Sequence, residues 1–348
     1  MQATVLILGA RGRFGLAAAR AFAEAGWRVL GQIRPGAVAP VLAASRTALP
    51  GGDVPVIEWL GLDLHDTQAL AQAAQGATVV VHALNPAYTN KAWQTQVAPM
   101  MDAAIAVTRA LDATLMVPGN LYNFGAAMPA LLREDTPQVA RTVKGQVRVA
   151  MEAQLQRSGV RGIVIRAGDF FGSGRGTWFD TVIVKDIRKG VFTYPGPRDV
   201  STAWAYLPDL ARTFVAVARQ RASLQPYEVF HFAGHRITGQ RWLDVLTPVA
   251  QAQGWLRPGA PLRWGGLPWG VIRVGALFRP TWAALLEMRY LWDVPHALAN
   301  DKLTALMGPE PHTPLAQAAQ TALADLGLLA AVPHRDPVAG QDRAAMVQ

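Results

Sequence analysis

The sequence predicts a doubly wound α/β domain with a parallel sheet, followed by a smaller, mostly helical domain, and three observations support this class. Strand-like and helix-like segments alternate through the first half of the chain, which is typical of a parallel sheet covered by helices on both faces. A glycine-rich turn separates the first strand-like segment from the first helix-like one. After Gly172, glycine, proline and tryptophan become frequent and the alternation fades, which marks a second domain.

The expected strands are short, nearly continuous apolar runs, as strands buried on both faces should be. The first, Thr4–Leu8, ends at a glycine, and the helix expected at Phe14–Ala25 is rich in alanine and stopped by Gly26 at the usual cap position. The other expected strands are residues 28–33, 54–60, 78–83, 114–118 and 161–166. The other expected helices follow Asp66 through Ala74, span residues 97–111, and carry Glu152 ahead of Gly159.

These patterns divide the chain into two domains and a tail. Residues 1–172 form the α/β domain, and a strand expected at residues 227–232 returns to its sheet. Residues 173–226 and 233–332, which hold most of the 11 tryptophans, form a substrate domain that lines a pocket. Residues 333–348 are short and polar and are expected to fray.

Composition excludes several classes of protein. With 51% hydrophobic and 16% charged residues the chain is too apolar to be disordered, and without cysteine it has no disulfides, thiolate metal sites or cysteine nucleophile. The net charge of +9 comes from 28 arginines and 5 lysines that are scattered along the chain, so we expect no nucleic-acid partner. Residues 265–286 are the most hydrophobic later stretch, but Arg273, Arg279, Pro268 and Pro280 interrupt them. We therefore expect no membrane partner and, without a visible targeting segment, a cytoplasmic location.

The segment Gly9-Ala10-Arg11-Gly12-Arg13-Phe14-Gly15 lies between the first expected strand and the first expected helix. Glycines at these positions let the chain turn tightly and let backbone N–H groups approach a pyrophosphate. The amino terminus of the helix adds a partial positive charge. This position in a strand–turn–helix unit predicts dinucleotide binding.

The Gly-x-x-Gly-x-x-Gly spacing resembles that of the extended short-chain dehydrogenase/reductases, the NAD-dependent epimerase/dehydratase family. Other segments are similar to the family as well: Asp63-Leu64, His82-Ala83-Leu84-Asn85, the block Val164 to Gly172, and Trp204 to Ala211. The resemblance implies a Rossmann domain in which Asp63 and Leu64 contact adenine. It further implies that Ala83, Leu84, Asn85 and Ala167 lie beside the cofactor.

The end of the second strand favours NADP over NAD. An NAD enzyme usually carries an acidic residue there that accepts from the ribose 2′-hydroxyl. No Asp or Glu lies between Arg28 and Val41, and Arg34 follows the strand directly. Arg34 together with Arg11 could hold a 2′-phosphate through fork-like hydrogen bonds. We expect NADP as cofactor, with NAD as the alternative.

The catalytic groups depart from the family pattern, which uses Ser or Thr, a Tyr, and a Lys four residues after the Tyr. Lys144 matches the family lysine by position and is expected to hold the nicotinamide ribose, but Ala140 stands at the tyrosine position. Asn120 falls where the family places its hydroxyl residue. Three interpretations remain open: Tyr122 supplies the phenol, Lys144 or a water on it acts as the acid, or the protein binds a dinucleotide without catalysis.

The leading hypothesis is an NADP-dependent oxidoreductase that acts on a small carbonyl or hydroxyl compound. The alternatives are a nucleotide-sugar epimerase or dehydratase, which needs a working tyrosine, and a non-catalytic NADP(H) sensor. We expect a small-molecule substrate as the partner, and the resemblance is compatible with a homodimer. His231 and His235 are expected on a strand and its loop rather than on one helix face, so no metal site is predicted.

Overall fold

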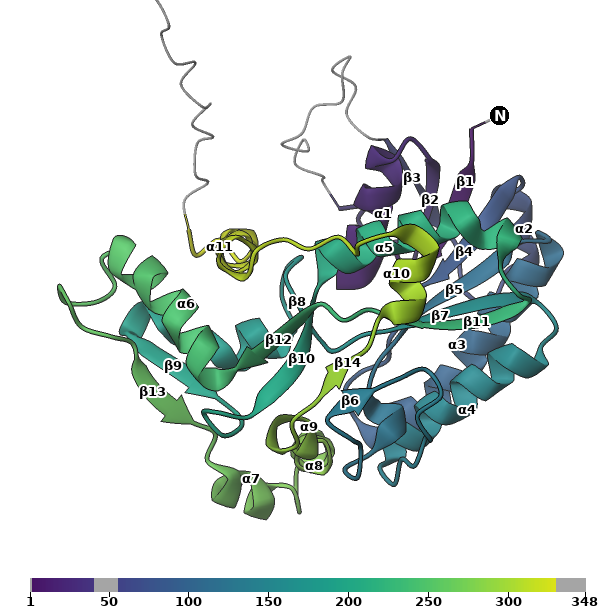
Figure 1. The fold of residues 1–348 in the computed structure, drawn as a ribbon. Coiled ribbons are helices and arrows are strands. Elements are labelled where there is room, and N and C mark those ends of the chain that lie inside the picture. The colour runs from purple at the N-terminus through teal and green to yellow at the C-terminus, as the bar shows by residue number, and fades with distance from the viewer. Residues whose placement is uncertain (1, 41–55, 330–348) are drawn as a thin grey trace, which may run out of the picture.

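In residues 2–40 and 56–329, which the computed structural model describes, seven parallel strands form the central sheet in the order β11-β7-β5-β4-β1-β2-β3 (Figure 1). These strands are β1 (Thr4–Leu8), β2 (Arg28–Ile33), β3 (Ile57–Gly61), β4 (Ala77–His82), β5 (Thr114–Gly119), β7 (Arg161–Arg166) and β11 (Tyr227–His231). The direction of strand order reverses between β1 and β4. In such sheets the crevice at the carboxyl ends of the two strands is where ligands bind.

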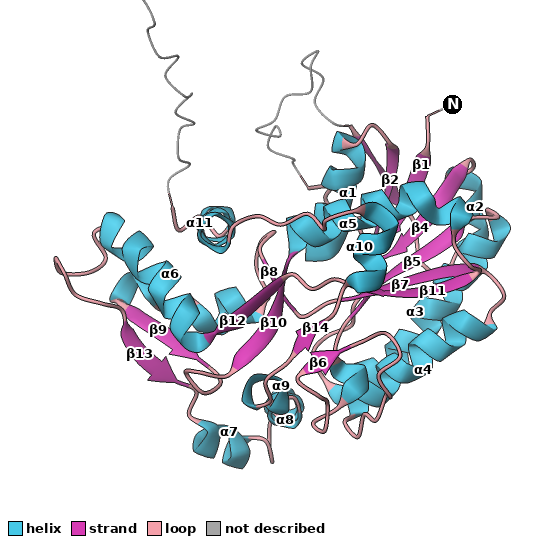
Figure 2. Cartoon of the chain, in the orientation of Figure 1, coloured by secondary structure: helices cyan, strands magenta, loops and turns pink. Residues whose placement is uncertain are grey.

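Helices cover both faces of this sheet (Figures 1 and 2). On one face lie α1 (Arg13–Glu24), α5 (Leu207–Gln220) and α10 (Asp301–Met307), and on the other α2 (Thr67–Ala73), α3 (Asn90–Ala110) and α4 (Val143–Arg157). Phe14 of α1 meets Phe214 of α5 edge to face, with ring centroids 4.8 Å apart. The apolar side chains of the inner strands are buried under these two layers, so the sheet holds the loops at its edge in fixed positions.

A second region, at the left of Figure 1, packs around an aromatic core. Its strands are β8 (Asp169–Phe171), β9 (Val191–Tyr194), β10 (Ser201–Tyr206), β12 (His235–Thr238) and β13 (Arg263–Gly266), and its helices are α6 (Gly239–Ala252) and α11 (Leu315–Asp325). Phe171, Trp204 and Trp242 are fully buried there and contact one another. The remaining strands and α-helices of the described residues are β6 (Leu131–Leu132), α7 (Trp269–Gly275), α8 (Pro280–Glu287), α9 (Tyr290–Asp293) and β14 (Ala297–Leu298).

Several boundaries differ from the sequence-based expectation. Helix α3 begins at Asn90 rather than at residue 97, because the Thr89 side chain caps it by accepting from the Ala92 N–H at 3.2 Å, and Pro99 lies inside it. Helices α5 and α10 fall within the ranges assigned to the substrate domain, yet both cover the central sheet. The third strand begins at Ile57; residues 54 and 55, like the tail at 333–348, lie outside the described residues.

Candidate active site

The glycine turn forms a tight loop between β1 and α1. Gly9 has φ +74°, and its carbonyl accepts from the Gly12 N–H at 2.9 Å. A Cβ on Gly15 would stand 2.4 Å from the Gly9 carbonyl oxygen and one on Gly12 would stand 3.1 Å from it, so side chains at these positions would displace backbone. The Gln32 side chain also holds the loop, since its Oε1 accepts from the Gly9 N–H at 2.9 Å. These contacts leave the amino terminus of α1 facing the crevice.

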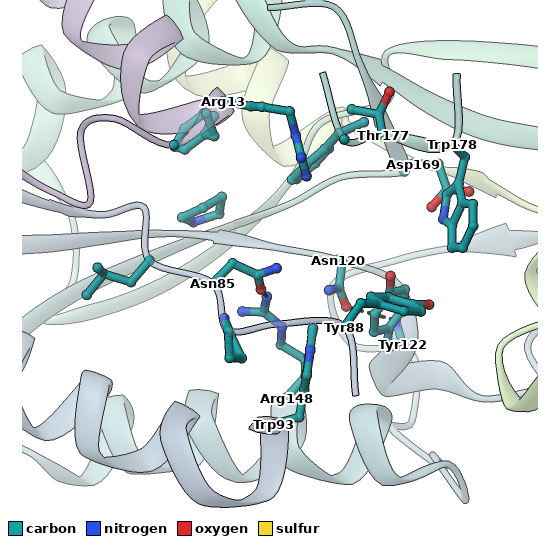
Figure 3. A pocket seen from close by; sticks show the side chains of 18 of the residues that line it. Arg13, Asn85, Tyr88, Trp93, Asn120, Tyr122, Arg148, Asp169, Thr177 and Trp178 are labelled. Atoms are coloured by element: carbon teal, nitrogen blue, oxygen red, sulfur yellow. Dashed lines mark hydrogen bonds between the residues drawn. The ribbon is translucent and has the colours of Figure 1, made fainter. Parts of the chain in front are cut away.

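A cavity of about 540 Å³ begins at this loop and runs along the carboxyl ends of β4, β5 and β7 to β8 (Figure 3). Its volume lies in the usual range for small-molecule sites. The residues that line it are Gly12, Arg13, Phe14, His82, Leu84, Asn85, Pro86, Tyr88, Trp93, Pro118, Asn120, Tyr122, Arg148, Gly168, Asp169, Phe170, Gly176, Thr177, Trp178 and Thr181. The cavity therefore joins the glycine loop at one end to a cluster of aromatic and titratable side chains at the other.

Arg13 extends from the first turn of α1 into the cavity (Figure 3). Its Nη1 donates to the Arg175 carbonyl at 3.1 Å, which fixes the guanidinium across the gap between the two regions. Burial lowers the pKa of Arg13, and the charges of Asp180 and Tyr122 act in the opposite direction. The guanidinium stays protonated and supplies a positive charge beside the loop.

Two phenols and a carboxyl group form the far end of the cavity. Tyr122 follows β5 in a short 3₁₀ turn, whose entry is set by the Asn120 side chain accepting from the Tyr122 N–H at 3.1 Å. Gly145 permits this turn to lie against α4, since a Cβ there would stand 2.4 Å from the Tyr122 carbonyl oxygen. Burial raises the pKa of Tyr122 and of Tyr88, and the neighbouring carboxyl of Asp169 raises both further. Both phenols are therefore protonated at neutral pH.

Asp169 opens β8 and faces this end of the cavity (Figure 3). The preceding Gly168 lets the chain pass β10, because a Cβ there would stand 2.1 Å from the Ala203 carbonyl oxygen. Burial raises the pKa of the Asp169 carboxyl to about 7, against the opposing influence of the Trp292 indole. The carboxyl group can thus hold or release a proton near neutral pH.

Arg148 is the cation that α4 presents to the cavity. Its Nη2 donates to Asn85 Oδ1 at 3.3 Å, and its guanidinium lies 4.9 Å from the ring centroid of Trp93. Its Nε is buried and has no hydrogen-bond partner. A second unpartnered buried nitrogen in the lining is Nε2 of His82, whose pKa burial lowers to about 4. These are groups that a bound ligand could satisfy.

Lys144 lies one helical turn before Arg148 but is not among the lining residues. Its Nζ donates to Asn90 Oδ1 at 2.6 Å and sits 4.4 Å from the ring centroid of Tyr88, behind the wall of the cavity. Burial lowers the pKa of Lys144 to about 8, while the charge of Glu287 raises it. The lysine that the sequence singles out thus supports Tyr88 from behind, and the position four residues later meets the cavity.

The other residues predicted to contact a cofactor divide into two sets. Ala83 and Leu84 lie against Gly9, and Asn85 lines the cavity. Outside the lining are Arg11, Arg34, Asp63, Leu64 and Ala167. Arg11, Arg34 and Asp63 are exposed, Ala167 is buried in the core of the sheet, and Asp63 Oδ1 accepts from the His65 N–H at 2.8 Å.

Sequence reasoning missed several lining residues. Tyr88, Trp93 and Trp178 sit in loops or on helices whose local patterns carry no chemical motif, and only the folded chain brings them together. Arg148 could have been predicted from the sequence, since it stands four residues after Lys144 and therefore lies on the same face of the helix.

Comparison with known families agrees with this geometry. The family model for the NAD dependent epimerase/dehydratase family matches residues 5–233, which is more than half of the chain. The chain belongs to this family. A search of curated proteins found no match.

Neither a helix long and apolar enough to cross a membrane nor a group of side chains suited to hold a metal ion occurs among residues 2–40 and 56–329.

Solved structures of similar fold include several epimerases. A protein from Burkholderia cenocepacia J2315, provisionally assigned as an epimerase, has 17% identity and a TM-score of 0.68, with 92% of this chain and 97% of that chain covered. UDP-glucuronic acid 4-epimerase from Bacillus cereus, solved with NAD, has 14% identity and a TM-score of 0.65, covering 92% and 96%. UDP-glucose 4-epimerase from Thermotoga maritima, solved with UDP-glucose, has 13% identity and a TM-score of 0.63, covering 92% and 98%. At these identities the likeness establishes the fold.

Proposed function

We propose that this protein is an NAD(P)-dependent oxidoreductase that exchanges a hydride between a nicotinamide dinucleotide and a small carbonyl or hydroxyl substrate. The observation that carries the proposal is the continuity of the cavity. It leads from an amide-lined turn at a helix amino terminus to a protonated phenol, Tyr122, with Asn120 and Asp169 beside it. A site for phosphates and a proton donor in one cavity are the two parts that such a reaction needs from the protein.

The residues of the loop fit a dinucleotide. The close contacts at Gly9, Gly12 and Gly15 leave room for a pyrophosphate to approach the backbone, and Arg13 adds a cation on the same side. Arg148 Nε and His82 Nε2 are buried donors or acceptors without a partner further along the cavity, where the ribose and nicotinamide would lie. When bound, the cofactor supplies or accepts the hydride.

Tyr122 is the group we assign to proton transfer. Its phenol stays protonated because it is buried next to Asp169, so it is suited to give a proton to a substrate oxygen as a carbonyl is reduced. The charges of Arg148 and Arg13 oppose the rise in the Tyr122 pKa, and they would stabilise the phenolate that remains after proton transfer. Asp169, with a pKa of about 7, is placed to hold the proton that restores the phenol. Lys144 faces Asn90 instead and has a supporting role in this scheme.

We further propose NADP(H) as the preferred cofactor. Arg11 and Arg34 are both exposed and follow the adjacent strands β1 and β2, and no acidic residue follows β2 before residue 41. Gln32, the last polar side chain of β2, cannot take the acidic role because it is engaged with Gly9, Ile33 and Leu62. Guanidinium groups at the end of this strand match a 2′-phosphate.

A substrate screen with two matched variants tests the proposal. The chain is assayed with NADPH and NADH against small aldehydes and ketones, and separately with UDP-glucose for epimerisation without net redox change. We expect Tyr122→Phe to lower reductive turnover by about 10² to 10⁴-fold with unchanged dinucleotide affinity. Tyr227→Phe, on β11 outside the cavity lining, should leave turnover unchanged. Equal turnover in Tyr122→Phe, or epimerisation as the only activity, would overturn the assignment.

A further inference from the structure

A cluster of exposed apolar side chains lies on the hairpin formed by α7, α8 and the turn that joins them. Val271, Val274, Leu277 and Phe278 are exposed by 61%, 63%, 79% and 81%. Among the described residues, these four make up half of the large hydrophobic side chains that are exposed, and they fall within eight consecutive positions. Apolar side chains gathered in this way mark an interaction surface more often than a solvated one.

The hairpin is a well-formed structure. A Cβ on Gly275 would stand 2.2 Å from the Trp282 ring, so α7 and α8 are in close contact at this glycine. In the turn, the Phe278 and Arg279 N–H groups both donate to the Gly275 carbonyl, at 3.0 and 2.9 Å. The backbone is thus satisfied internally while Leu277 and Phe278 point outward, which is the arrangement an apolar environment demands.

The exposed charges of the hairpin are positive. No Asp or Glu occurs from Val245 through Leu286, whereas this stretch carries Arg257, Arg263, Arg273 and Arg279. Glu287, which ends α8, is partly buried and accepts from Asn90 Nδ2 at 2.8 Å and from the Val143 N–H. Arg273 and Arg279 are exposed and flank the apolar side chains within the hairpin itself. The net charge of the whole chain is also positive, +9. A partner for this surface therefore has to offer both apolar material and negative charge.

We propose that the α7–α8 hairpin docks on a membrane surface that contains anionic lipid. Leu277 and Phe278 would enter the boundary between headgroups and acyl chains, and Arg273 and Arg279 would contact lipid phosphates. Trp269, which begins α7, and Trp282, which packs against Gly275 beside the turn, are half-buried and are the side-chain type found at this depth. Figure 1 shows α7 at the periphery of the molecule, where a flat surface can reach it.

This proposal replaces the expectation, drawn from the sequence, of no membrane partner. That expectation rested on Arg273, Arg279 and the two prolines, which prevent residues 265–286 from spanning a bilayer. The same four residues define the hairpin: Pro268 precedes α7 and Pro280 begins α8. Because these residues interrupt the apolar stretch, it forms a helical hairpin that can lie at the boundary between membrane and water instead of a helix that spans the bilayer.

Sedimentation of the full-length chain with vesicles tests the proposal. The probes are vesicles of phosphatidylcholine alone and of phosphatidylcholine mixed with phosphatidylserine. We expect binding to the mixed vesicles, weakened by high salt, and a loss of about tenfold or more in the variant L277S/F278S. R273Q/R279Q should lose the preference for phosphatidylserine.

The matched control is V38S/V139S, which removes two apolar side chains that are exposed by 77% and 51% elsewhere on the surface. This control should bind the mixed vesicles as the native chain does, and all variants should melt at the native temperature. The proposal is overturned if the native chain stays in the supernatant, or if L277S/F278S binds as tightly as the control. It is also overturned if light scattering shows a native dimer that L277S/F278S converts to a monomer, because the surface then joins two copies of the chain.

Discussion

The two ends of the cavity are built from different parts of the chain, one from backbone and the other from side chains. The glycine-loop end is made by backbone: a Cβ on Gly12 or Gly15 would meet the Gly9 carbonyl oxygen, and one on Gly9 would meet Ala83 and Leu84. The far end is made by side chains, and there the residues depart from the family pattern, with Ala140 where a tyrosine is expected and Arg148 facing the cavity where Lys144 does not. In the function proposed above, phosphate binding depends on backbone shape, whereas proton transfer depends on which side chains the far end presents.

The largest effect should come from the backbone end. Gly15→Ala places a Cβ 2.4 Å from the Gly9 carbonyl oxygen and 2.9 Å from the Ala10 Cα, so α1 has to shift away from the loop. We expect dinucleotide affinity to fall by about a hundredfold or more, measured by calorimetry. Gly266→Ala, where a Cβ meets nothing within 4 Å, serves as the control. Native affinity in Gly15→Ala would show that the loop does not hold the phosphates.

Lys144 and Arg148, two of the three cations of α4, should differ in their effect on dinucleotide binding. Arg148→Met removes the cation in the cavity, and we expect dinucleotide affinity to weaken by about tenfold, as the loss of one charge-assisted contact would cause. Lys144→Met removes the hydrogen bond to Asn90 but leaves the lining intact, so affinity should change by less than about twofold. Fluorescence titration of bound NADPH measures both. The reverse order of effects would mean that Lys144 holds the cofactor as the family lysine does.

The exposed arginines should have a smaller and selective effect. Arg11→Gln with Arg34→Gln should weaken NADPH binding by roughly fivefold, because exposed charge pairs contribute little. NADH affinity should not change, since its ribose lacks the 2′-phosphate. Competition between the two dinucleotides on the native chain and on the double variant gives the comparison directly. Preference of the native chain for NADH would refute the assignment of these two arginines.

Titration of the Asp169 carboxyl group should make both stability and turnover depend on pH. Because its pKa is raised from 3.8 to about 7, the folded state binds this proton more tightly than the unfolded state does, and stability falls as pH rises through this range. Asp169→Asn should therefore raise the free energy of unfolding at pH 8. The expected gain is about 1 kcal/mol, because the carboxyl group is partly open to the cavity. Below pH 4 the substitution should have no effect on stability. Reductive turnover of the native chain should decline above pH 7. A native pH profile in Asp169→Asn would exclude this carboxyl as the titrating group.

The local pattern of apolar and polar residues was enough to predict most strands of the sheet. It predicted little of the far end of the cavity. The strands Thr4–Leu8, Arg28–Ile33 and Arg161–Arg166 have the bounds expected from the sequence, because a short, mostly apolar run of this kind is buried most readily as a strand inside a sheet. Tyr88, Asp169 and Trp178 come from three separate segments that meet only through the strand order. The sequence analysis named Lys144 but not Arg148, although the two stand one helical turn apart, because packing against Asn90 and Trp93 decides which of them meets the cavity.

Every proposal made for this cavity requires the turn between β1 and α1 to bind the linked phosphates of a nicotinamide dinucleotide. Titration calorimetry of the purified chain with NADPH and with NADH, in parallel with Gly15→Ala, measures this binding. We expect saturable binding of one dinucleotide per chain, tighter for NADPH, and its loss in the variant. Failure of both dinucleotides to bind the native chain, even at millimolar concentration, would refute the assignment of this loop.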